Sequence, residues 1–140
     1  MSPALVDTNV LVYAYDSTET SKHLRAIELI ESLSAAQDLV VSAQVLNELA
    51  WVLLRKPRLV GARPELVANI LQEVAGSATV LPLSPDLTFS ALEAVAREGM
   101  SFWDALVWAA AFHHQIPTVY TEDFQHDREV AGVRFLNPFL

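Results

Sequence analysis

Four acidic residues stand far apart in this chain, each beside an apolar segment: Asp7, Glu48, Asp104 and Asp123. Asp7 follows a short apolar run, as a residue at the end of a buried strand would, and the carboxyl ends of parallel strands form the ligand-binding edge of α/β sheets. If the other three converge there, they form a cluster of oxygen ligands with no His or Cys nearby in sequence. Carboxylates at close range need a cation or bound protons, and oxygen-only ligation favours Mg²⁺ or Mn²⁺ over zinc.

Each carboxylate also has an ordinary structural interpretation. Asp7 has the position of a helix N-cap, and Glu48 lies on an expected helix, where an exposed Glu is commonplace. Asp104 completes a capping-box pattern that starts at Ser101, and Asp123 has the position of a turn residue. Asp104 is nevertheless the only acid of an almost wholly apolar segment. Residue type and position therefore leave both interpretations open.

Apolar patterning places these carboxylates in an alternation of strands and helices. Short runs rich in β-branched residues predict buried strands, and amphipathic segments bounded by Ser, Pro or Gly predict helices. The expected strands are 4–6, 39–42, 79–81, 118–120 and 133–136. The expected helices are 10–15, 21–35, 43–56, 63–75, 84–99 and 101–114. Strands separated by helices imply parallel crossovers and a sheet that is covered on both faces.

The composition restricts the class of protein. A chain of 140 residues, 52% hydrophobic and 19% charged, is expected to form one domain, 1–140, around one compact core. The chain has no cysteine, which excludes disulfides and thiolate zinc sites. No segment approaches the roughly 18 apolar residues of a membrane span. We therefore expect a cytoplasmic protein that is not associated with a membrane.

The charge distribution is uneven. A formal net charge of −8 is unusual for a nucleic-acid binder, because phosphate contacts need Lys and Arg. Four of the nine basic residues, however, lie in the stretch 55–63, and a local basic patch can bind phosphates. The same stretch also fits a helix end where basic side chains complement the dipole. We name Arg55, Lys56 and Arg58 as candidate phosphate contacts.

Four segments taken together resemble the PIN-domain nucleases, in particular the VapC-like toxins of toxin–antitoxin pairs. They are 6–11 (Val-Asp-Thr-Asn-Val-Leu), 42–49 (Ser-Ala-Gln-Val-Leu-Asn-Glu-Leu), 102–106 (Phe-Trp-Asp-Ala-Leu) and 120–124 (Tyr-Thr-Glu-Asp-Phe). These segments follow the order of the family and extend from one end of the chain to the other. A single Asp-Thr-Asn would be a weak signal, but four ordered acidic motifs are a strong one.

The resemblance implies a three-layer α/β/α sandwich with a mostly parallel central sheet. It also implies a metal-dependent endoribonuclease, the toxin of a toxin–antitoxin pair, which hydrolyses RNA phosphodiester bonds with Mg²⁺ or Mn²⁺. The family tends to form homodimers and to be blocked by a cognate antitoxin that enters the active-site groove. The residues that correspond to the family's catalytic and metal-binding positions are Asp7, Glu48, Asp104 and Asp123.

Neighbouring residues correspond to supporting positions of the family. Thr8 and Asn9 match residues that support the first aspartate, and Thr121 matches a hydroxyl residue that helps to order metal or phosphate. One difference follows the last acidic motif, where Asp127 stands at a position that is Gly in many relatives. This difference leaves open how the loop folds and whether Glu122 or Asp127 contributes to the site.

Two other functions are compatible with parts of the sequence. In an Asp-nucleophile phosphatase, Asp7 would form a phospho-enzyme, although the second acid expected two residues later is Asn9. In a non-catalytic protein-interaction module, the carboxylates would be helix caps and solubilising charges. Such a module would gain no stability from divalent metal ions.

Overall fold

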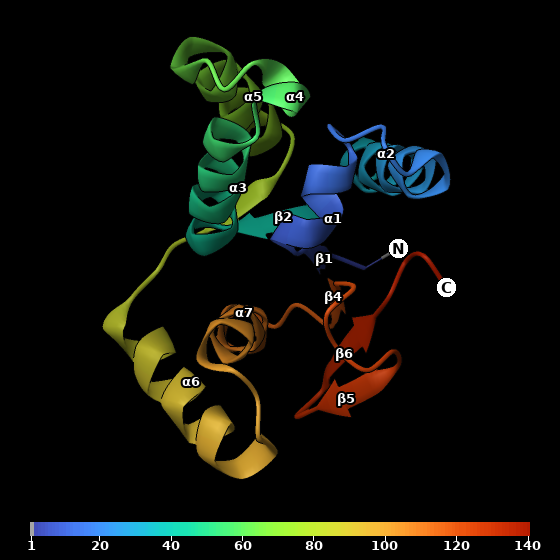
Figure 1. Cartoon of the computed structure of the whole chain (residues 1–140). Helices are drawn as coiled ribbons and strands as arrows, with labels where there is room; N and C mark the ends of the chain where they lie inside the picture. Colours follow the sequence, from blue (N-terminus) through green and yellow to red (C-terminus); the bar gives the residue numbers. More distant parts are fainter. Residues whose placement is uncertain (1) are drawn as a thin grey trace.

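The computed structural model describes residues 2–140 as a six-stranded sheet between two layers of helices (Figure 1). The strands are β1 Ala4–Val6, β2 Leu39–Ser42, β3 Thr79–Leu81, β4 Thr118–Tyr120, β5 Arg128–Val130 and β6 Val133–Leu136. The helices are α1 Thr8–Tyr13, α2 Thr20–Ala35, α3 Ala43–Arg55, α4 Pro57–Val60, α5 Pro64–Gly76, α6 Pro85–Glu98 and α7 Phe102–His113. This arrangement confirms the expected α/β/α sandwich. None of the helices described is long and apolar enough to span a bilayer.

The order of the strands defines where the site can form. The sheet runs β3-β2-β1-β4-β6-β5, and every pairing is parallel except that of β5 with β6. The chain moves outward from β1 to β3 and then returns to the other side of β1 as β4. Helices α1 to α5 lie on one face of the sheet, and α6 and α7 lie on the other (Figure 1). The carboxyl ends of β1 and β4 therefore form the topological switch point, where α/β proteins bind ligands.

Strand β1 and helix α7 are the most deeply buried elements beside this switch point. All three residues of β1 are buried, because the strand is covered on both faces of the sheet. Seven consecutive residues of α7, 105–111, are also buried. Within α7, the indole N–H of Trp108 donates a hydrogen bond to the carbonyl of Val130 at 3.0 Å. This bond ties α7 to β5, the edge strand of the sheet.

The structure differs from the sequence-based expectation at two elements and at both ends of the first helix. Strand β5 was not expected; it forms an antiparallel hairpin with β6 through Ala131 and Gly132, both with positive φ, as a type I′ turn requires. Helix α4 was also not expected, because Pro57 ends α3 and then begins a further short helix. The first helix is Thr8–Tyr13 rather than 10–15; it begins earlier because Asp7 caps it.

Asp127 takes the backbone conformation that glycine would favour at this position. Its φ is 66°, and its N–H donates to the carbonyl of Phe135 at 2.7 Å. Its carboxylate accepts a hydrogen bond from Arg134 at 2.7 Å. The Asp127 side chain therefore belongs to a surface ion pair with Arg134.

Candidate active site

Asp7 lies where the chain leaves β1 and enters α1, so its capping position and its position at the sheet edge coincide. Its Oδ1 accepts the N–H of Thr8 at 2.8 Å, and its Oδ2 accepts the hydroxyl of Thr121 at 2.9 Å. The residue is only 6% exposed. Burial raises the pKa of Asp7 from 3.8 to about 6, and the nearby charges of Glu48 and Asp123 act in the same direction.

A hydrogen-bond network joins α1 to the loop after β4. The Thr121 hydroxyl donates to Asp7 and accepts the Asn9 amide N–H and the Asp123 backbone N–H, each at 3.2 Å. The Asn9 amide also donates to Asp123 Oδ2 at 2.8 Å, and its oxygen accepts the Glu122 N–H at 3.2 Å. The two aspartates, 116 positions apart in sequence, are thus held by shared partners. The structure thus places Thr121 and Asn9 beside these aspartates, and their supporting role stays a prediction.

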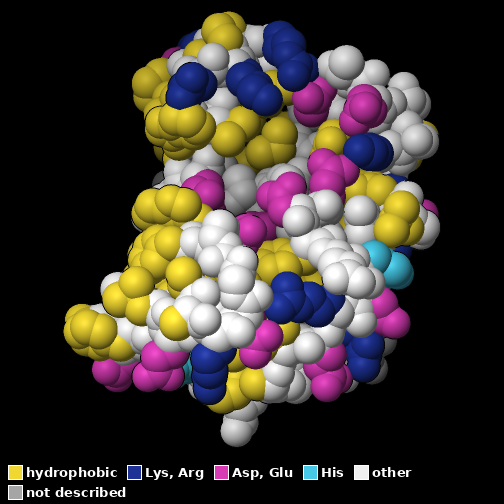
Figure 2. Space-filling view, turned by 60° about the horizontal axis from the view of Figure 1, so that its bottom comes forward, with side chains coloured by type: hydrophobic (Ala, Val, Ile, Leu, Met, Phe, Trp, Pro, Cys, Tyr) yellow, Lys and Arg dark blue, Asp and Glu magenta, His cyan; other side chains and the backbone are white. Residues whose placement is uncertain are grey.

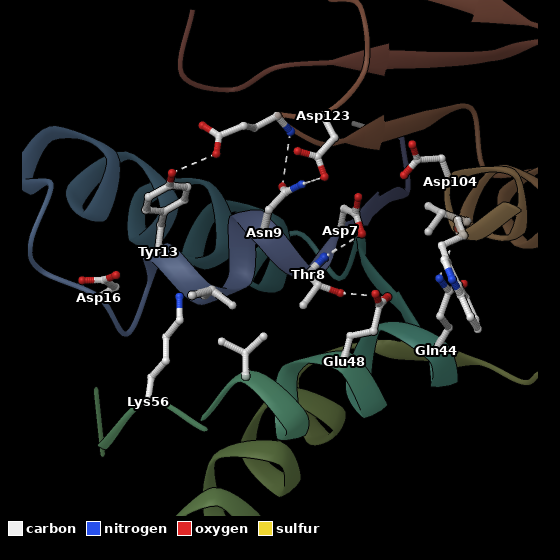
Figure 3. A pocket seen from close by; sticks show the side chains of 15 residues that line it. Asp7, Thr8, Asn9, Tyr13, Asp16, Gln44, Glu48, Lys56, Asp104 and Asp123 are labelled. Atoms are coloured by element: carbon white, nitrogen blue, oxygen red, sulfur yellow. Dashed lines mark hydrogen bonds between the residues drawn. The ribbon is translucent and has the colours of Figure 1, made fainter. Parts of the chain in front are cut away.

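Glu48 and Asp104 come to the same place from two helices. Glu48 lies on α3, and its Oε1 accepts the hydroxyl of Thr8 at 3.3 Å. Burial raises the pKa of Glu48, and the charges of Asp104 and Asp123 add to this effect. The N–H of Asp104 donates to the Ser101 side chain at 3.2 Å, which is half of the expected capping box. The reciprocal bond is absent from the residues described, and the Asp104 carboxylate points toward Asp7 instead (Figure 3).

All four carboxylates line one cavity of about 360 Å³. Figure 2 shows Asp and Glu side chains gathered in a hollow across one face, with Lys and Arg side chains along its upper rim. In Figure 3, Tyr13, Asp16 and Lys56 lie at one end of the cavity, and Gln44, Glu48 and Asp104 lie at the other. The full lining is Asp7, Thr8, Asn9, Val12, Tyr13, Asp16, Gln44, Glu48, Val52, Lys56, Trp103, Asp104, Val107, Glu122 and Asp123.

The donor set of this cavity suits a hard cation in kind. It offers carboxylate oxygens and the Gln44 amide; Gln44 is 4% exposed and donates from Nε2 to the carbonyl of Trp103 at 3.2 Å. The buried Oε1 of Gln44 has no hydrogen-bond partner among residues 2–140. Buried polar atoms normally have one, so this oxygen is available to a ligand in the cavity. No three acidic, His or Cys side chains of the described chain are close enough to surround one ion.

The three candidate phosphate contacts have different environments. Lys56 lines the cavity. The guanidinium of Arg55 lies over the ring of Trp51, 4.0 Å from its centroid. Arg58 donates to both carboxylate oxygens of Asp16, at 2.8 and 3.0 Å, and these bonds hold the pKa of Asp16 well below its ordinary value. Lys56 is thus the candidate that the structure brings to the carboxylates.

Sequence reasoning missed several residues of the cavity. Tyr13 lies one helical turn after Asn9, so its place on the same face of α1 could have been found from the i, i+4 spacing. Gln44 stands four positions before Glu48, and a polar residue on a helix that is otherwise apolar is a weak signal for it, whereas nothing in the sequence distinguishes Trp103 from a packing residue. Asp16 carries no signal at all in the sequence, because it follows α1 in a loop.

Comparisons with known proteins agree with this fold. The family model "PIN domain" matches residues 4–130. A chain of the VapBC2 complex from Rickettsia felis, bound to promoter DNA, has 18% identity and a TM-score of 0.67, with 94% of this chain and 96% of that chain covered. VapC20 from Mycobacterium tuberculosis, described as a sarcin–ricin loop cleaving toxin, has 24% identity and a TM-score of 0.64, with coverage of 86% and 89%.

A toxin–antitoxin complex from Klebsiella pneumoniae gives 18% identity and a TM-score of 0.69, with 96% of this chain and 97% of that chain covered. No protein of curated function matches the sequence. At these identities the solved structures show a shared fold. The family model covers far more than half of the chain, and it shows that this protein belongs to the PIN domain family.

Proposed function

We propose that this protein is a metal-dependent endoribonuclease and the toxin of a toxin–antitoxin pair. The observation that carries the proposal is the arrival of four carboxylates, from two loops and two helices, at one cavity at the switch point of a parallel sheet. Membership of the PIN domain family supports it. So does the structural neighbour VapC20, which is described as a sarcin–ricin loop cleaving toxin.

The electrostatics of the cavity favour a bound cation. Burial and mutual repulsion already raise the pKa of Asp7 and of Glu48, so the charged forms of these groups are costly without a positive partner. Asp7, Glu48, Asp104 and Asp123 would hold Mg²⁺ or Mn²⁺. Such an ion supplies Lewis-acid polarisation of the scissile phosphate, a lower pKa for the attacking water and stabilisation of the leaving oxygen.

The protein's own side chains orient this centre. Thr121 and Asn9 fix the directions of Asp7 and Asp123, and Thr8 holds Glu48 through its hydroxyl. The shared hydrogen bonds keep the carboxylates in place while they are charged, which reduces the reorganisation needed at the moment of reaction.

The free basic side chains support a polyanionic substrate. Six of the nine Lys and Arg residues make ion pairs within residues 2–140, and the remaining three are Arg55, Lys56 and Arg97. Two of these three lie at the end of α3, and Lys56 lines the cavity. A cation without an internal partner is available to a phosphate. We therefore assign Lys56 to a phosphate next to the scissile one.

Exposed apolar side chains beside the cavity support the proposed protein partners. Trp51 and Trp103 are 59% and 62% exposed, and together with Leu83 and Leu106 they line a second hollow that shares Glu48 with the first. An apolar surface of this kind is typical of a protein interface. We propose that a cognate antitoxin and a second copy of the chain bind there; a toxin–antitoxin complex is among the structures whose fold this chain shares.

Cleavage of a defined RNA by matched variants tests the proposal. Asp7→Asn and Asp104→Asn should each abolish cleavage in Mg²⁺ or Mn²⁺ while the circular dichroism spectrum stays that of the wild type. Glu31→Gln, which removes an exposed carboxylate of α2, should cleave like the wild type. If the attack of water expels the 3′-oxygen, each cut leaves a 5′-phosphate and a 3′-hydroxyl, and the ends should be ligatable. Cleavage that persists in EDTA, or in both Asn variants, would contradict the proposal.

A further inference from the structure

Two adjacent acids, Glu122 and Asp123, line the cavity, but the chain binds them in different ways. Asp123 is bound by Asn9, within the network that also holds Asp7. The carboxylate of Glu122 accepts the hydroxyl of Tyr13 at 2.8 Å and the ammonium of Lys22 at 2.7 Å. We propose that Tyr13 and Lys22 hold Glu122 apart from the cluster, so that only Asp123 of the two acids joins it. This inference rests on the proposed function.

The clamp, by which we mean Tyr13, Lys22 and Glu122, is built from three elements. Tyr13 ends α1, Lys22 lies in the first turn of α2, and Glu122 follows β4. The Lys22 ammonium also lies 3.4 Å from the Tyr13 hydroxyl and 5.1 Å from the centre of its ring. Phe139 packs edge-on against Tyr13, with ring centroids 5.1 Å apart, and covers Lys22 as well. Packing on several sides gives Tyr13 and Lys22 fixed positions.

Two residues on one face of helix α1 bind the two acids at different places. Asn9 and Tyr13 are four residues apart and therefore share one face of the helix. That face meets the loop after β4, where Asn9 binds Asp123 and Tyr13 binds Glu122. Figure 3 shows Tyr13 on the side of Asn9 that faces away from Asp104 and Glu48. The backbone N–H of Glu122 donates to the Asn9 side chain, so the clamp and the cluster meet at one residue.

The clamp has two separable consequences. It fixes the loop from which Asp123 points, which affects the chemical step. It also pairs a carboxylate that lines the cavity with a cation, so that RNA approaching this end does not meet an uncompensated negative charge. An effect on the chemical step should change kcat. An effect of the charge on RNA binding should change KM and the dependence of KM on salt concentration.

Four variants of the full chain test the clamp with RNA cleavage in Mg²⁺. Lys22→Met leaves Glu122 charged and unpaired, and it should raise KM by about tenfold and lower kcat. Lys22→Met combined with Glu122→Gln removes that charge and should bring KM back toward the wild-type value. Glu122→Gln alone removes the charge and leaves one acceptor oxygen where Glu122 has two, one for Tyr13 and one for Lys22, so it should lower kcat without raising KM. Arg63→Met is the matched control, because it removes a cation from the exposed pair with Glu65.

Three outcomes would overturn the inference. If Lys22→Met lowers the melting temperature but leaves kcat and KM unchanged below that temperature, the clamp is a structural contact only. If KM stays equally high in the double variant, Lys22 binds RNA itself and does not act through Glu122. If the wild type cuts no RNA, both the proposed function and the inference that depends on it are wrong. The first two outcomes contradict only the inference and leave the proposed function unchanged.

Discussion

Replacing Asp7 with Asn should stabilise the metal-free protein at neutral pH. The folded protein holds a buried carboxylate whose pKa is about 6, whereas the ordinary value is 3.8. An Asn side chain can still accept the Thr8 N–H with its oxygen, but its amide cannot replace the bond to Thr121, whose hydroxyl already accepts two hydrogen bonds. The variant therefore loses one hydrogen bond, which costs about 1 kcal/mol, and also loses the buried charge, whose removal is the larger effect.

The size and sign of the effect follow from proton linkage. The pKa of Asp7 is about 6 in the folded chain and 3.8 in the unfolded chain. This difference changes the free energy of unfolding by about 3 kcal/mol between low and high pH. The folded state binds the proton more tightly, so the wild type keeps this stability below pH 3.8 and loses it as the pH rises through about 6. Above that pH, the free energy of unfolding of Asp7→Asn should be higher than that of the wild type by up to about 3 kcal/mol, which corresponds to a Tm about 10 °C higher.

Urea and thermal unfolding in EDTA at pH 3.5 and pH 7.5 would measure this difference. The difference in free energy of unfolding between Asp7→Asn and the wild type should be present at pH 7.5 and absent at pH 3.5. The control variant Glu31→Gln should unfold like the wild type at both pH values. Adding Mg²⁺ at pH 7.5 should stabilise the wild type more than the variant, because the charge then has a partner. A variant that is less stable than the wild type at pH 7.5, or a gap of equal size at both pH values, would refute the reasoning.

Three further substitutions have defined outcomes. Thr121→Val removes a hydroxyl that makes three hydrogen bonds and should lower the free energy of unfolding by about 1–3 kcal/mol in urea, whereas Thr121→Ser should not. Lys56→Met should weaken RNA binding and reduce the slope of log affinity against log salt by about 0.7, with Arg97→Met as an unaffected control. Trp108→Phe leaves the Val130 carbonyl without its donor and should cost about 1–3 kcal/mol of stability without changing kcat; an equal loss of kcat would contradict this.

The expected strands were predictable because their signals are local. All five occur with the predicted bounds, since short β-branched runs between polar residues have few alternatives to a buried strand. The position of Asp7 followed from the same signal, because the end of β1 is the edge of a parallel sheet. The fold class and the family are accordingly confirmed.

Strand β5 and helix α4 were missed for physical reasons. Only Val130 of β5 is buried, and the hairpin turn uses Ala131-Gly132 rather than the usual Asn-Gly, so neither periodicity nor turn chemistry indicated an edge strand. Pro57 was interpreted only as the end of a helix, although Pro is equally suited to the first position of the next one. Both signals are ambiguous without tertiary contacts.

The candidate site shows the same division between local and distant information. The sequence named the carboxylates, and the structure places them around one cavity, but their roles remain predictions. The sequence does not predict which distant residues pair with each other. Arg58 binds Asp16, 42 positions away, and Lys22 binds Glu122, 100 positions away. These pairings decide which charges remain free for a ligand. Only folding brings the partners together, so residue type alone overstates Arg58 as a phosphate contact.

The most direct test of the central claim is cleavage of total cellular RNA by the purified protein in Mg²⁺, in Mn²⁺ and in EDTA, beside the Asp7→Asn variant. We predict discrete cuts with either ion, none in EDTA and none with the variant, together with a rise in the wild-type Tm on adding the ion. No cleavage under any condition, with a Tm that does not respond to divalent ions, would contradict the claim that the four carboxylates form a metal-dependent ribonuclease centre.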